Sequence, residues 1–178
     1  MKTIIVLAMH GAPPSDFPKQ ELAEFFRLHS QFEYTEGKPQ GNHLLRHKEL
    51  ERKIRRWPRT AENDPFHAGS MDLALSLRQA SGTDIMLGFN EFCDPSLDEA
   101  LQAAARSGAE RVIVVTPMLT RGGEHAEKDI PAAVERARRK HPGIEFIYAW
   151  PFPLSEIARF ISDHLKKFSV EGKGHLDD

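Results

Sequence analysis

The sequence predicts an α/β fold: a single three-layer domain with a four-stranded, mainly parallel sheet and helices on both of its faces. Two observations lead to this prediction. Short, continuous apolar runs recur at 4–9, 85–89, 112–115 and 144–150, and such runs are typical of strands that are buried on both faces. Helical patterns separate these runs, and a strand, a helix and a further strand in succession form a right-handed crossover to a parallel neighbour.

The segment between the first two predicted strands is longer than one crossover helix requires. Ser15 or Asp16 is placed to begin a helix that runs to about Leu28. Residues 31–70 then contain several glycines and prolines, no strand pattern, and a basic helical stretch at 44–57. We interpret residues 31–70 as an insertion of loop and helix within the domain, with the predicted role of a lid.

The elements after residue 70 alternate regularly. Capping residues, prolines and glycines place helices at 71–80, 94–106, 129–141 and 153–168. The last residues, 171–178, are polar and are expected to be disordered. Residues 1–170 therefore form the predicted domain.

Charge, hydropathy and cysteine content exclude several classes of protein. The chain has 178 residues, and 24 Lys and Arg side chains nearly balance 26 Asp and Glu side chains, for a formal net charge of −2. This balance argues against a general nucleic-acid-binding protein, and the single cysteine, Cys93, cannot form an intrachain disulfide. The apolar runs are far shorter than the ~20 residues of a membrane-spanning helix. We expect no membrane segment, no signal peptide and a cytoplasmic location.

Three side chains with metal-binding chemistry follow three different predicted strands. His10 follows the first strand, Glu91 the second and His125 the third. The carboxyl ends of parallel strands meet at one edge of the sheet, where ligands bind, so we expect these side chains to converge. Two imidazoles and a carboxylate suit a first-row transition metal and would leave coordination positions open for a substrate. The alternative is that each is an ordinary polar residue of a surface loop.

Three stretches of the sequence resemble the motifs of the class II tetrapyrrole chelatases. Residues 119–131, Leu-Thr-Arg-Gly-Gly-Glu-His-Ala-Glu-Lys-Asp-Ile-Pro, are similar to the family's Gly-Gly loop, histidine and Asp-Ile-Pro helix start. Residues 88–97, Gly-Phe-Asn-Glu-Phe-Cys-Asp-Pro-Ser-Leu, are similar to its second motif, and His10-Gly11 to its third. The resemblance is best over 83–167 and is nearest to the small, single-domain sirohydrochlorin cobaltochelatases of the CbiX type.

The resemblance implies an enzyme that inserts a divalent metal into sirohydrochlorin or a related tetrapyrrole, in cobalamin- or siroheme-type biosynthesis. It implies that His10 and His125 bind the metal and that Glu91 assists, so these three are the predicted catalytic residues. Co²⁺ is the expected metal substrate, with Fe²⁺ or Ni²⁺ as alternatives, and no nucleotide is needed. Because longer members of the class carry two such halves facing one cleft, we expect a homodimer. The alternatives are a non-catalytic metal or tetrapyrrole carrier on the same fold and, with less support in the sequence, a metal-dependent hydrolase.

Two further sets of residues are predicted to contact the tetrapyrrole. Gly122 and Gly123, next to Arg121, would let a flat ring approach the backbone closely. In the basic stretch of the insertion, three arginines would pair with the carboxylates of the ring: Arg52, Arg55 and Arg56. The alternative for this stretch is a solvated helix face.

Other residues with metal-binding chemistry are given structural interpretations. Four histidines lie in or beside the insertion: His29, His43, His47 and His67. We interpret them as scattered surface histidines, with a second metal site as the alternative. Cys93 lies two residues from Glu91, and as a lone cysteine it is interpreted as a packing residue rather than a ligand.

Overall fold

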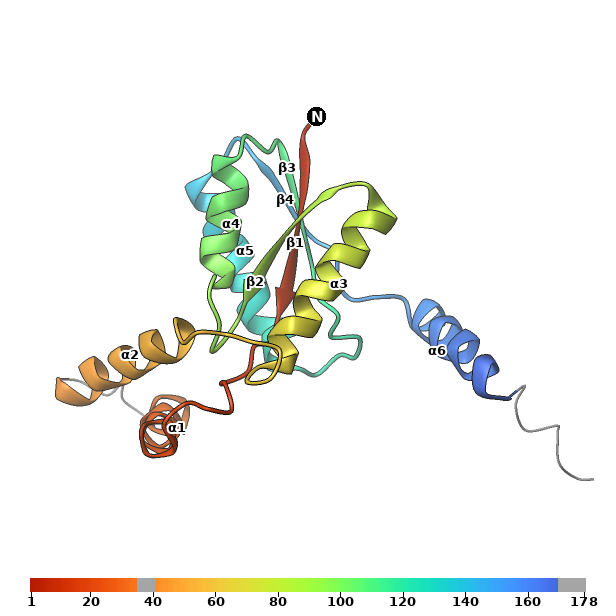
Figure 1. Ribbon diagram of the computed structural model, residues 1–178. Coiled ribbons are helices and arrows are strands. Elements are labelled where there is room, and N and C mark those ends of the chain that lie inside the picture. Colours follow the sequence, from red (N-terminus) through yellow and green to blue (C-terminus); the bar gives the residue numbers. More distant parts are fainter. Residues whose placement is uncertain (35–40, 170–178) are drawn as a thin grey trace, which may run out of the picture.

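The computed structural model describes residues 1–34 and 41–169, and its centre is a four-stranded sheet (Figure 1). The strands are β1 (Thr3–Met9), β2 (Asp84–Phe89), β3 (Arg111–Val115) and β4 (Glu145–Tyr148). They lie in the order β2-β1-β3-β4, and each of the three pairings is parallel. The predicted α/β architecture is confirmed, and the sheet is wholly parallel. The predicted disordered tail, 171–178, lies outside the described residues.

One face of the sheet carries the main hydrophobic core, beneath α4 (Leu97–Arg106) and α5 (Ile130–Lys140) (Figure 1). Side chains alternate between the two sides of a strand, so alternate residues of each strand reach this core. Val6, Val112 and Val114 are buried here against Leu101 of α4 and Val134 of α5. This packing fixes β1 and β3, and with them the starting points of the loops that follow these strands.

The opposite face is covered over β2 and β1 by α3 (Pro65–Ser81), which packs against Leu7 and Leu87. Helices therefore lie on both faces, as predicted. Farther across this face a row of three paired isoleucines on β1, β3 and β4 is only partly buried: Ile5, Ile113 and Ile147. The two faces of the sheet are thus covered to different extents.

Two helices, α1 (Lys19–Tyr34) and α2 (Asn42–Arg55), lie beyond the carboxyl ends of the strands (Figure 1). They pack through a small core in which Phe25 and Leu28 of α1 meet Leu50 and Ile54 of α2. The predicted basic helix at 44–57 is confirmed as α2, with a start and an end about two residues earlier. This helical pair therefore stands next to the edge of the sheet where ligands bind in parallel α/β folds.

The starts of three further helices also differ from the prediction, and one of these helices, α4, begins at Leu97 rather than at residue 94. The Asp64 side chain accepts a hydrogen bond of 2.9 Å from the backbone of His67, so α3 starts at residue 65 rather than 71 and takes up the end of the predicted insertion. α1 starts at residue 19, later than predicted, and runs beyond the predicted end. The Asp16 carboxylate does not cap α1, because it accepts hydrogen bonds from the side chains of Trp57 and Asn63.

The last helix, α6 (Leu154–Ser169), projects away from the sheet (Figure 1). Its predicted position, 153–168, is confirmed within one residue at each end. Several of its large apolar side chains are exposed: Leu154, Phe160, Ile161, Leu165 and Phe168. Within the described ranges, 1–34 and 41–169, no helix combines the length and the apolar character that crossing a bilayer requires.

Candidate metal centre

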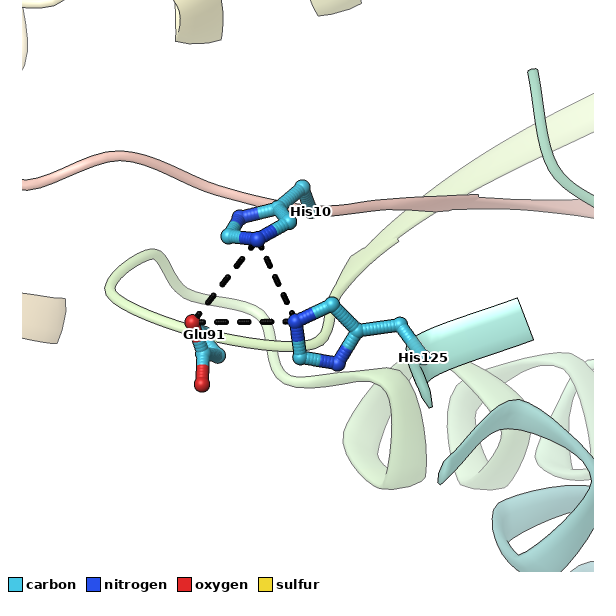
Figure 2. Close-up of side chains that lie close together, drawn as sticks. All are labelled: His10, Glu91 and His125. Atoms are coloured by element: carbon cyan, nitrogen blue, oxygen red, sulfur yellow. Dashed lines mark hydrogen bonds and ion pairs between the residues drawn. The ribbon is translucent and has the colours of Figure 1, made fainter. Parts of the chain in front are cut away.

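The three predicted ligands converge at the carboxyl ends of the strands. Figure 2 shows the side chains of His10, Glu91 and His125 pointing toward one another from three different segments. One ligand atom from each lies within 4.8 Å of the other two. The two Nε2 atoms of the histidines are 3.2 Å apart, and a carboxylate oxygen of Glu91 lies 4.0 Å from His10 and 3.8 Å from His125. The predicted convergence of these residues is therefore present in the fold.

Backbone hydrogen bonds extend the pairing of β1 and β2 into the loops that carry His10 and Glu91. The Asn90 N–H donates to the carbonyl of Met9, and the Glu91 N–H donates to the carbonyl of His10, each at 2.9 Å. Gly11 has a φ of +101°, and a Cβ atom there would lie 1.9 Å from the Glu91 carbonyl oxygen. A glycine after His10 is therefore required by both the backbone conformation and the close approach of the Glu91 loop.

His125 lies in a helical turn that begins earlier than predicted. The sequence predicted a helix start at residue 129, whereas η1 (His125–Asp129), a π-helical turn, runs directly into α5. In this turn the His125 Nδ1 atom lies 2.6 Å from a carboxylate oxygen of Asp129. Tyr148 of β4 donates a hydrogen bond of 2.9 Å to the carbonyl of Ala126, and burial raises the pKa of this phenol to about 12. The turn is thus fixed to the sheet immediately after His125.

The hydrogen bonds of the two histidines determine which of their nitrogens can bind a cation. The His10 Nδ1 atom lies 2.8 Å from the Gly11 carbonyl oxygen, and the His125 Nδ1 atom faces the Asp129 carboxylate. Both partners only accept hydrogen bonds, so each neutral ring carries its proton on Nδ1 and a lone pair on Nε2. Two lone pairs that face each other at 3.2 Å repel unless a cation lies beside them. The Glu91 carboxylate adds negative charge, so the site favours a positive ion.

The separation of the two nitrogens also suits one metal ion. Two nitrogen ligands about 2.1 Å from the same ion are roughly 3.0–3.4 Å apart for coordination angles between octahedral and tetrahedral. The 3.2 Å between the Nε2 atoms of His10 and His125 lies inside this interval. Two imidazoles and one carboxylate are a donor set for cobalt, nickel, iron or zinc.

The loop that carries Glu91 is held by an arginine of α2. Arg55 donates to the carbonyl oxygens of Asn90 and Cys93, on either side of Glu91, at 2.8 and 2.7 Å. Arg55 is one of the three arginines predicted to contact the substrate, and its guanidinium also binds this loop. Of the other two predicted arginines, Arg56 lies 3.7 Å from the Asp94 carboxylate, with 71% of its side chain exposed.

A second arginine, Arg59, also holds this loop, and sequence reasoning did not predict this role. Arg59 donates to the backbone carbonyls of Phe92 and Ala12 and pairs with the buried carboxylate of Asp64. Its side chain is only 8% exposed. Cys93 is also buried here, and burial raises the pKa of its thiol. Arg59 therefore joins the loops after β1 and β2 to the start of α3.

One hollow borders the cluster, and a second hollow adjoins it, with Arg55 and Ser96 in the lining of both. The first, of about 260 Å³, is lined by Glu91, His125 and Asn90, among others. The Asn90 side-chain nitrogen is buried and has no hydrogen-bond partner among the described residues. The second hollow, of about 330 Å³, is also lined by two of the predicted arginines, Arg52 and Arg56. The basic face of α2 is thus next to the candidate ligands.

The predicted glycine loop occupies a different place. Arg121 lines a hollow of about 590 Å³ together with Pro151 and Phe152, and this hollow shares no lining residue with the one beside His125. Gly122 has a φ of +91°, which explains the glycine, and a Cβ atom at Gly122 or Gly123 would meet no atom within 4 Å. The loop therefore has open space above its backbone.

The comparison with protein families identifies the chain. The sequence profile of the CbiX family matches residues 63–166, which is more than half of the 178 residues. This chain belongs to the CbiX family. The matched segment includes Glu91 and His125 and begins after His10.

Relatives of this CbiX-family chain carry chelatase names. A sirohydrochlorin ferrochelatase of Priestia megaterium is 31% identical over 84 residues, which are 47% of this chain and 31% of that protein. A sirohydrochlorin cobaltochelatase of Sulfurisphaera tokodaii is 33% identical over 81 residues, 45% of this chain and 63% of that protein. The chain thus covers less than two thirds of either relative. The crystal structure of a CbiX protein from Marinobacter aquaeolei has the same fold, with a TM-score of 0.50, 22% identity, and coverage of 96% of this chain and 99% of the other.

Proposed function

We propose that this CbiX-family protein inserts a divalent metal into a tetrapyrrole of the sirohydrochlorin type, with His10, Glu91 and His125 as the catalytic residues. The observation that carries the proposal is the pair of facing Nε2 atoms 3.2 Å apart beside the Glu91 carboxylate. The names of the relatives support the tetrapyrrole. They include both a cobaltochelatase and a ferrochelatase. Two imidazoles and a carboxylate suit several first-row metals, and we propose Co²⁺ as the metal, with Fe²⁺ and Ni²⁺ as the alternatives.

The three residues bind the metal and accept protons in this reaction. His10 and His125 bind the ion through Nε2 while it loses water, and Gly11 and Asp129 keep the two rings in the required tautomer. As the ion passes to the ring nitrogens, the tetrapyrrole releases its pyrrole N–H protons. The imidazoles freed from the metal and the Glu91 carboxylate are the bases within reach of these protons. No step requires ATP or another nucleotide.

The substrate contacts in this proposal come from α2 and from the glycine loop. Arg52 and Arg56 line the second hollow, which adjoins the one beside the cluster, and there they can pair with ring carboxylates through bidentate hydrogen bonds. Arg55 borders both hollows and contributes charge while it holds the Glu91 loop. Away from α2, the tetrapyrrole would approach the open backbone of Gly122 and Gly123, next to Arg121. The lid role of residues 31–70 belongs to the same proposal.

The experiment that tests the proposal is an anaerobic absorption assay with sirohydrochlorin and Co²⁺. We expect the protein to accelerate the spectral change of metal insertion above the uncatalysed rate, and the His10→Ala/His125→Ala variant to lose this acceleration. Parallel assays with Fe²⁺ and Ni²⁺ rank the metals. A rate equal to the background with all three metals, together with retained binding of the metal or the ring, would instead establish the alternative of a non-catalytic carrier.

We also propose a homodimer in the cytoplasm. The exposed apolar side chains of α6, among them Phe160 and Phe168, and the partly exposed isoleucine row beside α3 support a partner chain, since large apolar patches mark interfaces. Light scattering after size exclusion tests the dimer. A Phe160→Glu/Phe168→Glu variant is expected to run as a monomer, and a wild-type protein that is monomeric at assay concentrations would contradict the proposal.

A further inference from the structure

A second pair of histidines lies on the other side of Glu91. His29 of α1 and His47 of α2 place their Nδ1 and Nε2 atoms 3.2 Å apart. The Oε1 atom of Glu91 lies 3.9 Å from the Nε2 atom of His29, whereas its Oε2 atom faces His10 and His125. One carboxylate therefore lies between two pairs of imidazoles. The interpretation of His29 and His47 as scattered surface histidines is wrong.

The outer pair, His29 and His47, has the same separation between its facing nitrogens as the inner pair. Its nitrogens are separated by 3.2 Å, again within the roughly 3.0–3.4 Å expected of two nitrogens on one ion. A metal-binding histidine commonly directs its other ring nitrogen to a carboxylate. The two nitrogens of His29 have different neighbours in the same sense: Nδ1 lies 3.2 Å from His47, and Nε2 lies 3.9 Å from the Glu91 carboxylate, within ion-pair but not hydrogen-bond distance.

Two ion pairs hold together the two helices that carry the outer pair. Arg46 pairs with Glu24 at 2.8 Å, and Lys53 pairs with Glu21 at 2.7 Å. The ring of Phe25 stacks on both histidines, with centroid distances of 5.4 and 4.9 Å. The two imidazoles are thus positioned before any ligand arrives, which lowers the cost of binding.

We propose that His29 and His47 form a second binding position for a divalent transition-metal ion, separated from the first by Glu91. Among the described residues the inner position has a third ligand, Glu91, within reach of both histidines, so we expect the outer position to bind the ion more weakly. Imidazole selects Co²⁺, Ni²⁺, Fe²⁺ or Zn²⁺ over Mg²⁺ and Ca²⁺. If the proposed chelatase function holds, the outer position supplies the next ion to the inner one, and this role, unlike the binding itself, rests on that function.

The binding is tested by anaerobic titration of the full chain with Co²⁺, and calorimetry and the visible absorption of the bound ion monitor the titration. The wild type is expected to bind two equivalents, one tighter than the other. The His29→Asn/His47→Asn variant should keep only the tight one, and the His10→Ala/His125→Ala variant only the weak one. His43→Ala is the matched control, because His43 is an exposed histidine of the same helix, α2; it should bind two.

The outcomes separate this proposal from the proposed function. If the wild type binds one equivalent and the His29→Asn/His47→Asn variant binds the same one, the outer pair is an ordinary hydrogen bond between two histidines. If the inner variant retains full chelatase activity, the proposed function fails, whereas a second equivalent lost only with His29 and His47 would still stand.

A measurement on the wild type covers the case in which the double variant does not fold. With ¹⁵N-labelled histidine, the first equivalent of Zn²⁺ should shift the ring nitrogens of His10 and His125, and the second those of His29 and His47. Unchanged signals of His29 and His47 at saturation overturn the proposal. The supply role predicts that His47→Asn raises the apparent KM for Co²⁺ severalfold at unchanged kcat; equal KM values would restrict the outer position to binding alone.

Discussion

The loops that follow the strands and the arginines of α2 meet at one site but are placed there by different forces. Parallel pairing of β1 with β2 and β3 brings His10, Glu91 and His125 to the same edge of the sheet. The position of Arg55 depends instead on two backbone carbonyls of the Glu91 loop. The positions of the ligands are therefore set by the topology of the sheet, whereas the shape of the Glu91 loop is set by contacts from a helix distant in sequence.

The strongest test of this comparison removes the histidines set by the sheet. The His10→Ala/His125→Ala variant lacks both Nε2 ligands of the inner cluster. Loss of a residue that only orients a ligand lowers metal affinity by up to about 100-fold, so the Co²⁺ affinity of this variant should fall by more than that. Anaerobic titration measures this. His164→Ala, an exposed histidine of α6, is the control that should bind as the wild type does; tight binding by the double variant would place the inner metal elsewhere.

The second test asks whether Arg55 positions the loop or contacts the substrate. Arg55→Gln removes two charge-assisted hydrogen bonds to the loop, which should lower the free energy of unfolding by about 1.5–3 kcal/mol. Because the loop carries Glu91, Co²⁺ affinity should fall even when no tetrapyrrole is present. Urea denaturation and metal titration measure the two effects.

Arg56→Gln is the matched control for this test. Arg56 lies close to Arg55, at the end of the same helix, but 71% of its side chain is exposed, so its loss should change neither stability nor Co²⁺ affinity and should raise only the KM for the tetrapyrrole. Equal Co²⁺ affinities of Arg55→Gln and Arg56→Gln would contradict a positioning role for Arg55.

The same contrast explains which parts of the site the sequence could reveal. Apolar runs and capping residues located the strands, and a parallel sheet then required His10, Glu91 and His125 to meet. Arg55 and Arg59 bind backbone carbonyls. Every residue has a backbone carbonyl, so the sequence contains no pattern that could predict these partners. Asp129 was detectable in principle, since a histidine and an acid four residues apart face each other on a helical turn, but the helix was predicted to begin at residue 129, and the π-helical turn was missed.

The third test weakens the orientation of a sheet-edge ligand without removing it. Asp129→Asn keeps an oxygen that can accept from the His125 Nδ1 atom, 2.6 Å away in the wild type, but removes the charge that makes the imidazole a stronger donor to metal. Co²⁺ affinity should fall by about 10–100-fold. Glu127→Gln is the control, because Glu127 is in the same turn but accepts from the Gly122 backbone; an equal loss there would indicate a general effect of negative charge.

The smallest expected effect concerns the helix that borders the site but holds none of the proposed ligands. Ser96 and Glu99 form a reciprocal cap at the start of α4, and hydrogen bonds from the Ser96 N–H and hydroxyl lower the pKa of Glu99 from its ordinary 4.5. Ser96→Ala should reduce the free energy of unfolding by about 1 kcal/mol and leave Co²⁺ affinity unchanged.

The cap also predicts the sign of a pH dependence. Because the folded-state pKa of Glu99 is lowered, its contribution to stability is fully present above the ordinary pKa and is lost as the pH falls through the folded value. The wild type should therefore exceed Glu99→Gln in stability near neutral pH, and the difference should shrink in acid below about pH 4.5. Urea denaturation across this range measures the difference. A stability difference that stays constant with pH would mean that the ionised carboxylate does not contribute.

The Ser96→Ala variant has its own contradicting outcome. A loss of Co²⁺ affinity as large as that of Arg55→Gln would show that α4 shapes the Glu91 loop as strongly as α2 does.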